Sequence, residues 1–255
     1  NSQDGPTRLV MEAMRQRLRL ELRLALNGGF CEDSQMLGTI HRTDLTTIGD
    51  DVPGDFHKTG VVQRLKRALS EGKLSVSEGT GLSDLATFYD LHLATRRRLR
   101  GLCQPWQYFL ILREEFMRSG HGSVLTAWYL GKPVAGVVLL QGHGSLTYKH
   151  AASLPAFWKL APNHLLIWHA MQAGRRAGLK WFDWGRTGYR SQSLRDFKRA
   201  WAPEESELTG VCLPGSGPRI PRLLGWLRSA VLVSQSICPQ TFTRYVASRL
   251  YRHFP

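Results

Sequence analysis

The 255-residue sequence has few cysteines and lacks the motifs of several large enzyme classes. Its 4 cysteines lie far apart, which argues against a zinc site or a disulfide scaffold and fits reduced thiols in the cytosol. It has no Walker A loop, Gly-x-Gly-x-x-Gly, His-Glu-x-x-His or Gly-x-Ser-x-Gly motif, which argues against nucleotide hydrolysis, dinucleotide redox chemistry, zinc proteolysis and serine hydrolysis. No apolar run approaches the roughly 18 residues of a membrane span. The chain begins at Asn1 rather than Met, so we treat this end as a cut.

Acidic residues are scarce relative to basic ones. The chain has 34 Lys and Arg against 20 Asp and Glu, a net charge of +14, and most of the excess lies after residue 100. A positive field of this size favours anionic partners such as phosphates, RNA or anionic lipid surfaces, although basic charge that serves only solubility is an alternative. Hydrophobic residues make up 42% of the chain, enough to form a buried core.

Hydropathy patterns and turn residues predict the order of elements. Tight turns at 131–133 and 142–144 join three strands, which should therefore be antiparallel neighbours. The basic segment 219–254 should be helical. The predicted strands are 17–26, 73–78, 123–130, 134–141, 145–152, 180–184 and 206–213, and the predicted helices are 56–71, 83–99 with Ser83 as its N-cap, 106–118, 163–177 and 191–200.

Several segments resemble one protein family. Residues 182–186 (Phe-Asp-Trp-Gly-Arg) and 194–201 (Leu-Arg-Asp-Phe-Lys-Arg-Ala-Trp) look like the "FDFG…FK..WG" ending of FemAB-type proteins, which are peptidoglycan-bridge aminoacyltransferases and their acetyltransferase-like relatives. Residues 160–168 are similar to the family's helix entry. Segments 95–99, 56–58 and 64–68, together with Pro105 and Phe109, also fit the family pattern, so the resemblance covers roughly residues 40–255.

The element order, a three-stranded meander followed by a long helix and a crossover strand, is similar to the Gcn5-related acyltransferase (GNAT) fold. The resemblance implies an α/β (α+β) protein with a mixed, mostly antiparallel sheet and flanking helices. It divides the chain into a remnant of a first GNAT-like half (1–55), a connecting basic helix (56–72), a GNAT-like acyltransferase domain (73–213) and basic C-terminal helices (214–255). Because the family's first half contributes to the acceptor site, a chain lacking part of it could be inactive.

The resemblance places the donor's phosphates at the amino end of the long helix, where free backbone N–H groups and the helix dipole favour anions. Here that corner is 159–163, in which Pro162 suits the first turn and Asn163 could act as the cap. The corner lacks the Gly-x-Gly/Ala that wraps a pyrophosphate, which counts against ordinary coenzyme A binding and leaves aminoacyl-tRNA or a differently held thioester open. We assign Lys159, Asn163 and Arg186 to the donor, with a plain helix cap as the alternative.

Lys198 and Asp183 are the first catalytic candidates. The resemblance gives the Lys198 ammonium the role of stabilising the donor phosphate or the tetrahedral oxyanion, and a solvated lysine beside Arg195 is the alternative. Asp183 ends a short apolar strand, where partial desolvation could prepare its carboxylate for base work. It could equally cap the turn that follows or pair with Arg186.

The third meander strand and the arginine-rich helix supply the remaining candidates. A period of two places Tyr148 and His150 on one face of the strand, where His150 could relay a proton near neutral pH, although a hydrogen-bonded core histidine is an alternative. The arginines of 96–100 cannot all face one way on a helix. We assign Arg97 and Arg98 to an acceptor phosphate, with solvated arginines as the alternative.

The sequence therefore predicts an acyltransferase that moves an activated acyl or aminoacyl group onto an amine or hydroxyl of a peptidoglycan or exopolysaccharide precursor. The donor is acyl-CoA or aminoacyl-tRNA, and no metal is required. Alternatives are an acyl-CoA-dependent N-acetyltransferase of polysaccharide assembly and a non-catalytic RNA- or phosphate-binding module. We expect a cytoplasmic location, with tRNA and an anionic inner membrane face as partners of the basic surface, and we infer no stable protein partner.

Overall fold

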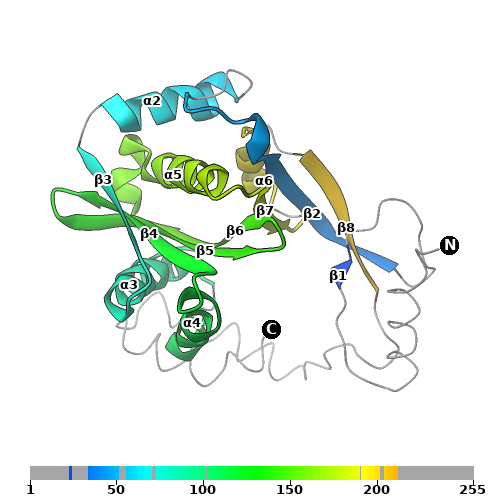
Figure 1. Cartoon of the computed structure of the whole chain (residues 1–255), viewed down its shortest axis with the longest axis horizontal. Helices are drawn as coiled ribbons and strands as arrows, with labels where there is room; N and C mark the ends of the chain where they lie inside the picture. The colour runs from blue at the N-terminus through cyan, green and yellow to red at the C-terminus, as the bar shows by residue number, and fades with distance from the viewer. Residues whose placement is uncertain are drawn as a thin grey trace.

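A computed structural model describes residues 23–24, 34–51, 56–70, 73–101, 103–189, 191–201 and 204–211. Its centre is one eight-stranded sheet in the order β1-β8-β2-β7-β6-β5-β4-β3 (Figure 1). Every neighbouring pair is antiparallel except β6 and β7, which run parallel. The strands are β1 (Arg23–Leu24), β2 (Ser34–Asp44), β3 (Leu74–Gly79), β4 (Gly122–Tyr129), β5 (Lys132–Gly142), β6 (Ser145–Ser153), β7 (Trp181–Thr187) and β8 (Glu204–Val211).

The predicted mixed, mostly antiparallel sheet is confirmed, and so is the three-stranded meander β4-β5-β6. Leu130 and His143 adopt left-handed backbone angles in its two tight turns, each followed by a glycine with positive φ, as short hairpin turns require. The predicted strand 17–26 lies outside the described residues apart from β1. The predicted C-terminal helices also lie outside them.

The described α-helices are α2 (Gln63–Ser70), α3 (Leu82–Arg98), α4 (Trp106–Leu112), α5 (Pro162–Arg176) and α6 (Gln192–Arg199). One π-helical turn (Lys58–Val62) precedes α2, and another (Arg113–Met117) continues α4. The predicted N-cap at Ser83 is wrong, because α3 begins after Gly81. The carboxylate of Asp84 accepts the Gly81 N–H at 3.0 Å and so closes the helix start from inside the first turn. None of the described helices is long and apolar enough to cross a membrane.

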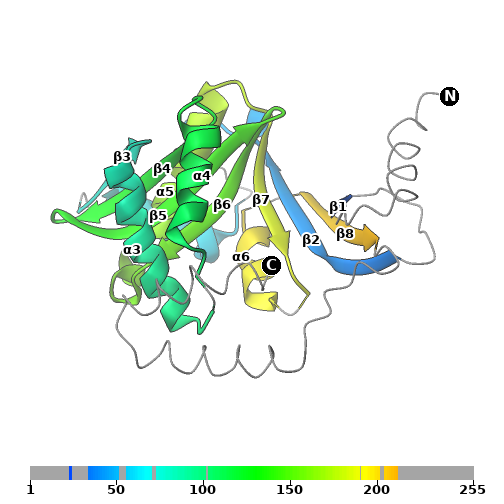
Figure 2. The same cartoon turned by 90° about the horizontal axis from the view of Figure 1, so that it is seen from below.

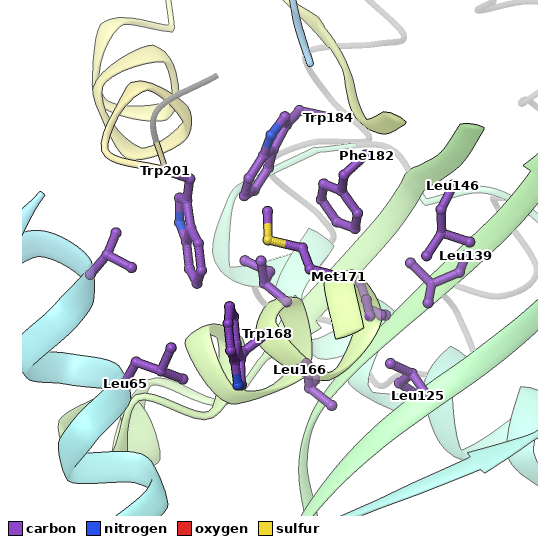
Figure 3. Close-up of a cluster of buried hydrophobic side chains, with 14 of the residues drawn as sticks. Leu65, Leu125, Leu139, Leu146, Leu166, Trp168, Met171, Phe182, Trp184 and Trp201 are labelled. Carbon is purple, nitrogen blue, oxygen red and sulfur yellow. The ribbon is translucent and has the colours of Figure 1, made fainter. Parts of the chain in front are cut away.

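Helices cover both faces of the part of the sheet formed by β3 to β7. α3 and α4 pack on one face, and α2 and α5 lie over the other (Figures 1 and 2). The larger core cluster lies on the α5 face and joins α2, α5, β7 and Trp201, two residues after the end of α6. Figure 3 shows Trp168, Trp184 and Trp201 converging there. The smaller cluster joins α3 and α4 to the opposite face, and contains Phe88 and Phe109. Strands β3 to β7 therefore form the middle of three layers.

β2 is a strand that the hydropathy pattern does not predict. It pairs with β7 on one side and with β8 on the other, and so extends the sheet past the crossover strand. Residues 34–44 thus share one sheet with the later strands, while the division of the chain at residue 55 stays a prediction. At the β2–β7 contact, the backbone O of Thr187 lies only 2.1 Å from where a Cβ on Gly38 would stand, so the two strands need a glycine here.

Candidate active site

The site lies where two parallel strands separate. β6 and β7 pair only over three positions, Ser145–Thr147 with Trp181–Asp183, and then diverge, as Figure 2 shows. A cleft of about 490 Å³ opens beyond this point, between the end of α3, β6, the start of α5, β7 and α6. Residues 148–153 of β6 all line it, both odd and even positions. Because alternate side chains point to opposite faces of a strand, the cleft must follow the edge of β6 through the sheet.

A β-bulge at Lys149 determines where the β6 side chains point. Leu139 of β5 pairs with Tyr148 and Val138 pairs with His150, so Lys149 is an extra residue in the strand. The prediction that Tyr148 and His150 share a face is wrong for this reason. Tyr148 packs against Phe182 and Trp184 on the α5 face, whereas His150 contacts Tyr108 and Phe109 on the α4 face.

Lys198 is the buried cation of the cleft. It lies in the last turn of α6, lines the cleft and is only 3% exposed, so the alternative of a solvated lysine is wrong. Its Nζ donates to the backbone O of Gly185 at 2.9 Å and to that of Arg186 at 3.4 Å. Burial lowers the pKa of Lys198 to about 8, and the charge of Asp183 partly opposes that shift. The side chain is still mostly an ammonium ion at neutral pH.

Aromatic packing holds α6 and its lysine in place. Phe197 contacts His164 of α5 and Trp184 of β7, and Trp201 lies against Phe56, His164 and Trp184. The His164 Nε2 is 3.0 Å from the backbone O of Gly60, which ties α5 to the π-helical turn before α2. These contacts anchor Lys198 to the hydrophobic core rather than to a surface loop.

The amino end of α5 reaches the cleft through Asn163. The helix begins with Pro162 after Ala161, whose left-handed backbone (φ 53°) turns the chain into it, so Asn163 is not the cap that the sequence predicts. Asn163 instead donates from Nδ2 to the Ser153 hydroxyl at 3.1 Å, bridging α5 to the edge of β6. Lys159 is exposed in the preceding 3-10 helix and does not line the cleft.

The helical phase of α3 decides which arginines face the cleft. His92, Thr95, Arg96 and Leu99 line it, a spacing that marks one face of a helix. Arg98 also lines it, with its guanidinium 4.9 Å from the ring centroid of Trp158. Arg97, the other predicted acceptor-binding residue, lies outside the lining residues.

Asp183 and Arg186 have different positions relative to the cleft. Asp183 caps the turn that follows it, accepting the Gly185 N–H at 2.7 Å, and its second oxygen lies 3.7 Å from Nε of Arg42. The ion pair is thus with Arg42 of β2 rather than with Arg186. Arg186 is exposed and lines the cleft, whereas Asp183 does not line it.

Two histidines form the wall of the cleft on the α3 side. Nε2 of His92 is 2.6 Å from Oε1 of Gln104, and Nε2 of His150 is 2.9 Å from the Tyr108 hydroxyl. The two rings lie edge to face, with centroids 5.7 Å apart. Burial lowers the pKa of His92 to about 4 and that of His150 to about 3, so both are neutral at pH 7.

The structure thus gathers six of the nine predicted site residues around one cleft. Lys198, His150, Tyr148, Asn163, Arg186 and Arg98 line it, and Asp183, Lys159 and Arg97 do not. Sequence reasoning missed His92, Gln104 and Arg96. The helical spacing of His92, Thr95, Arg96 and Leu99 is visible in the sequence, but nothing there shows which face of α3 meets β6. Among the described residues no group of three or more His, Cys, Asp or Glu is placed to hold a metal.

Comparison with known proteins agrees with this geometry. A family model described as an acetyltransferase (GNAT) domain matches residues 57–199. The fold is similar to that of FemX (TM-score 0.61, 14% identity, covering 90% of this chain and 72% of that one). It is also similar to the C-terminal domain of a putative lysylphosphatidylglycerol synthetase from Agrobacterium fabrum (TM-score 0.53, 17% identity, 80% of this chain and 67% of that one). No curated protein sequence matches the chain.

These structural likenesses concern the fold, because the identities are low. The family match is more specific, since it spans more than half of the chain and includes α3, the meander, α5, β7 and α6, the elements that surround the cleft. The predicted GNAT-like acyltransferase is therefore confirmed at the level of the family. The chain belongs to the acetyltransferase (GNAT) domain family.

Proposed function

We propose that this protein transfers an activated acyl or aminoacyl group onto an amine or hydroxyl of a cell-envelope precursor, of peptidoglycan or of an exopolysaccharide. The observation that carries the proposal is the buried ammonium of Lys198 at the point where β6 and β7 separate. An ammonium has three N–H donors, and two of them bond to the carbonyls of Gly185 and Arg186. The third is available for an oxygen in the cleft.

That third donor suits the oxyanion of an acyl-transfer reaction. When the acceptor attacks the carbonyl carbon, negative charge develops on the carbonyl oxygen, and a fixed cation in a water-poor site stabilises it. Because Lys198 is held by backbone carbonyls and by the core packing of α6, it does not have to reorganise during the reaction.

Two other cleft residues suit the proton steps. Burial raises the pKa of the Tyr148 phenol, so it is protonated at neutral pH and can donate to the departing thiolate or alkoxide. The neutral imidazole of His150 lies in the opposite wall and can accept the acceptor's proton. Such a reaction forms the new bond by direct attack and needs no covalent enzyme intermediate.

Acyl-CoA is the donor that the family supports, and aminoacyl-tRNA is the alternative. Asn163 at the start of α5 and Arg186 lie in the cleft, where donor phosphates could contact both. Because both donors are cytoplasmic molecules, this function places the reaction in the cytoplasm.

The test compares Lys198→Met with Lys66→Met in the full chain. Lys66 is an exposed lysine of α2, which makes it a matched control for charge and substitution. Mass spectrometry of envelope precursors incubated with the protein and acetyl-CoA or aminoacyl-tRNA should show a new acyl group, at least a hundredfold less of it with Lys198→Met, and no change with Lys66→Met.

The salt dependence of binding separates this proposal from a phosphate- or RNA-binding module. Saturable binding of acetyl-CoA with modest salt dependence supports the enzyme. Steep salt dependence without preference between acetyl-CoA and tRNA, together with equal activities of the two lysine variants, would overturn the proposal.

A further inference from the structure

The charged side chains that the structure places around the cleft are of one sign. Five basic residues line it, and no Asp or Glu is among the lining residues that the structure describes. The basic residues come from α3, β6, β7 and α6: Arg96, Arg98, Lys149, Arg186 and Lys198.

Asp183, whose charge acts on Lys198, and Glu205, which faces α6, both already have partners. Asp183 accepts the N–H of Gly185 and faces Arg42, so its charge is shared with two donors outside the cleft lining. Glu205 of β8 bonds to Arg195 and Arg199 of α6. Neither carboxylate is therefore available to receive a cationic group in the cleft.

The remaining polar groups of the cleft wall are neutral. His92 and His150 are uncharged at pH 7, with Gln104 bonded to His92 and Tyr108 bonded to His150. Asn163 and Ser153 also line the cleft, and the Asn163 amide donates to the Ser153 hydroxyl. Neutral imidazoles, amides and hydroxyls donate to and accept from a hydroxyl group, which supplies one donor and two acceptor sites.

An ammonium ion would meet a different environment. A primary amine is protonated at pH 7, and a charged acceptor would enter a cleft of like charge without a carboxylate to pair with. A hydroxyl enters the cleft uncharged and does not meet this repulsion.

We infer that the acceptor group is an uncharged hydroxyl rather than an ammonium, carried by a molecule that bears phosphate or carboxylate groups for the cleft's arginines and lysines. This inference rests on the proposed function and specifies its acceptor. In the reaction the hydroxyl oxygen bonds to the acyl carbon, the carbon–sulfur bond of the thioester breaks, and the hydroxyl proton ends on the released thiol. The product is an ester.

The test uses two probes that differ only in the group at issue. 2-Hydroxyethyl phosphate and phosphoethanolamine carry the same phosphate on the same two-carbon chain, one ending in a hydroxyl and the other in an ammonium. Calorimetric titration of the full chain at pH 7 should give at least tenfold tighter binding of the hydroxyl probe. Raising the pH toward the pKa of the amine should narrow the difference, because the neutral amine escapes the repulsion.

A carboxylate placed in the cleft should reverse part of this preference. Leu99 lines the cleft and is 55% exposed, so Leu99→Glu adds the missing charge without emptying the core, and it should reduce the preference at least threefold. Leu69 on α2 is 48% exposed and lies outside the cleft lining, so Leu69→Glu is the matched control and should leave the preference unchanged.

The two proposals fail in different ways. Equal binding of the probes, tighter binding of phosphoethanolamine, or no measurable binding of either at millimolar concentration would overturn the hydroxyl inference. The binding readout needs no acyl donor. If the preference is found but no precursor is acylated with any donor, the cleft's preference for a hydroxyl ligand stands and the proposed acyl transfer fails.

Discussion

The buried ammonium of Lys198 should make activity and stability depend on pH in opposite directions. The group titrates at 10.5 in an exposed lysine and at about 8 in the folded protein, mainly because burial disfavours the charged form. At about 1.4 kcal/mol for each tenfold change in proton affinity, the difference corresponds to roughly 3 kcal/mol. Below pH 8 both states carry the proton, and the folded state bears the full cost.

The number of protons bound by the folded and unfolded chains determines how stability changes with pH. Between pH 8 and pH 10.5 the unfolded chain binds the Lys198 proton and the folded chain has released it, so the free energy of unfolding rises with pH over that range. Turnover should fall over the same range, with an apparent pKa near 8, because the ammonium that stabilises the oxyanion is lost. The protein should therefore become more stable as it becomes less active.

Urea unfolding of wild type and Lys198→Met from pH 7 to 10.5 measures the effect. Methionine cannot titrate, so subtracting the two free energies of unfolding removes every other titrating group, and the difference should change by about 3 kcal/mol in favour of the wild type. Lys66→Met, with its exposed side chain, should show no such change. A flat difference for Lys198→Met, or turnover that rises through pH 9, would refute the role of a buried ammonium.

Three further predictions concern the frame around the cleft. Trp201→Ala should lower the free energy of unfolding by roughly 3 to 5 kcal/mol in urea titrations, because this fully buried ring packs against Phe56, His164 and Trp184. Gly38→Ala should cost more than about 2 kcal/mol in the same titrations, since φ is +147° and a Cβ would meet the backbone of β7, whereas Gly142→Ala, with open space around it, should cost little. Tyr108→Phe should cost roughly 1 to 3 kcal/mol by removing the hydroxyl beside His150, and an unchanged melting temperature would contradict that hydrogen bond.

Elements fixed by local signals could be predicted from the sequence. The meander follows from two short turns, and the ends of α5 follow from Pro162 and Gly178, so both were placed to within about two residues. β2 has no such signal. Its described buried side chains, Thr39, His41 and Thr43, alternate as in a half-buried strand. Because they are polar, a hydropathy pattern does not reveal the strand.

Only part of the site could be predicted, because its geometry depends on strand pairing and helix packing as well as on local sequence. Lys198 was found through a family pattern, but the bulge at Lys149 comes from the pairing of β6 with β5, which no local pattern specifies. Likewise, the choice of Arg96 rather than Arg97 depends on which side of α3 packs against the sheet. Register and helix rotation are tertiary properties, and both decide which side chains reach the cleft.

The position of Lys198 is a consequence of the core as much as of the cleft. α6 is short and mostly polar, and its contacts with the hydrophobic core are made by Phe197 and by Trp201 just after its end. Those two rings pack on His164 of α5, the helix whose start lies at the cleft through Asn163. A change in this packing would therefore move the Lys198 ammonium relative to the start of α5, where we place the donor's phosphates. On this reasoning, Trp201→Ala should lower kcat by a larger factor than it changes KM, even at temperatures where the variant stays folded. The lysine would keep its charge but would no longer be held in position for the reaction.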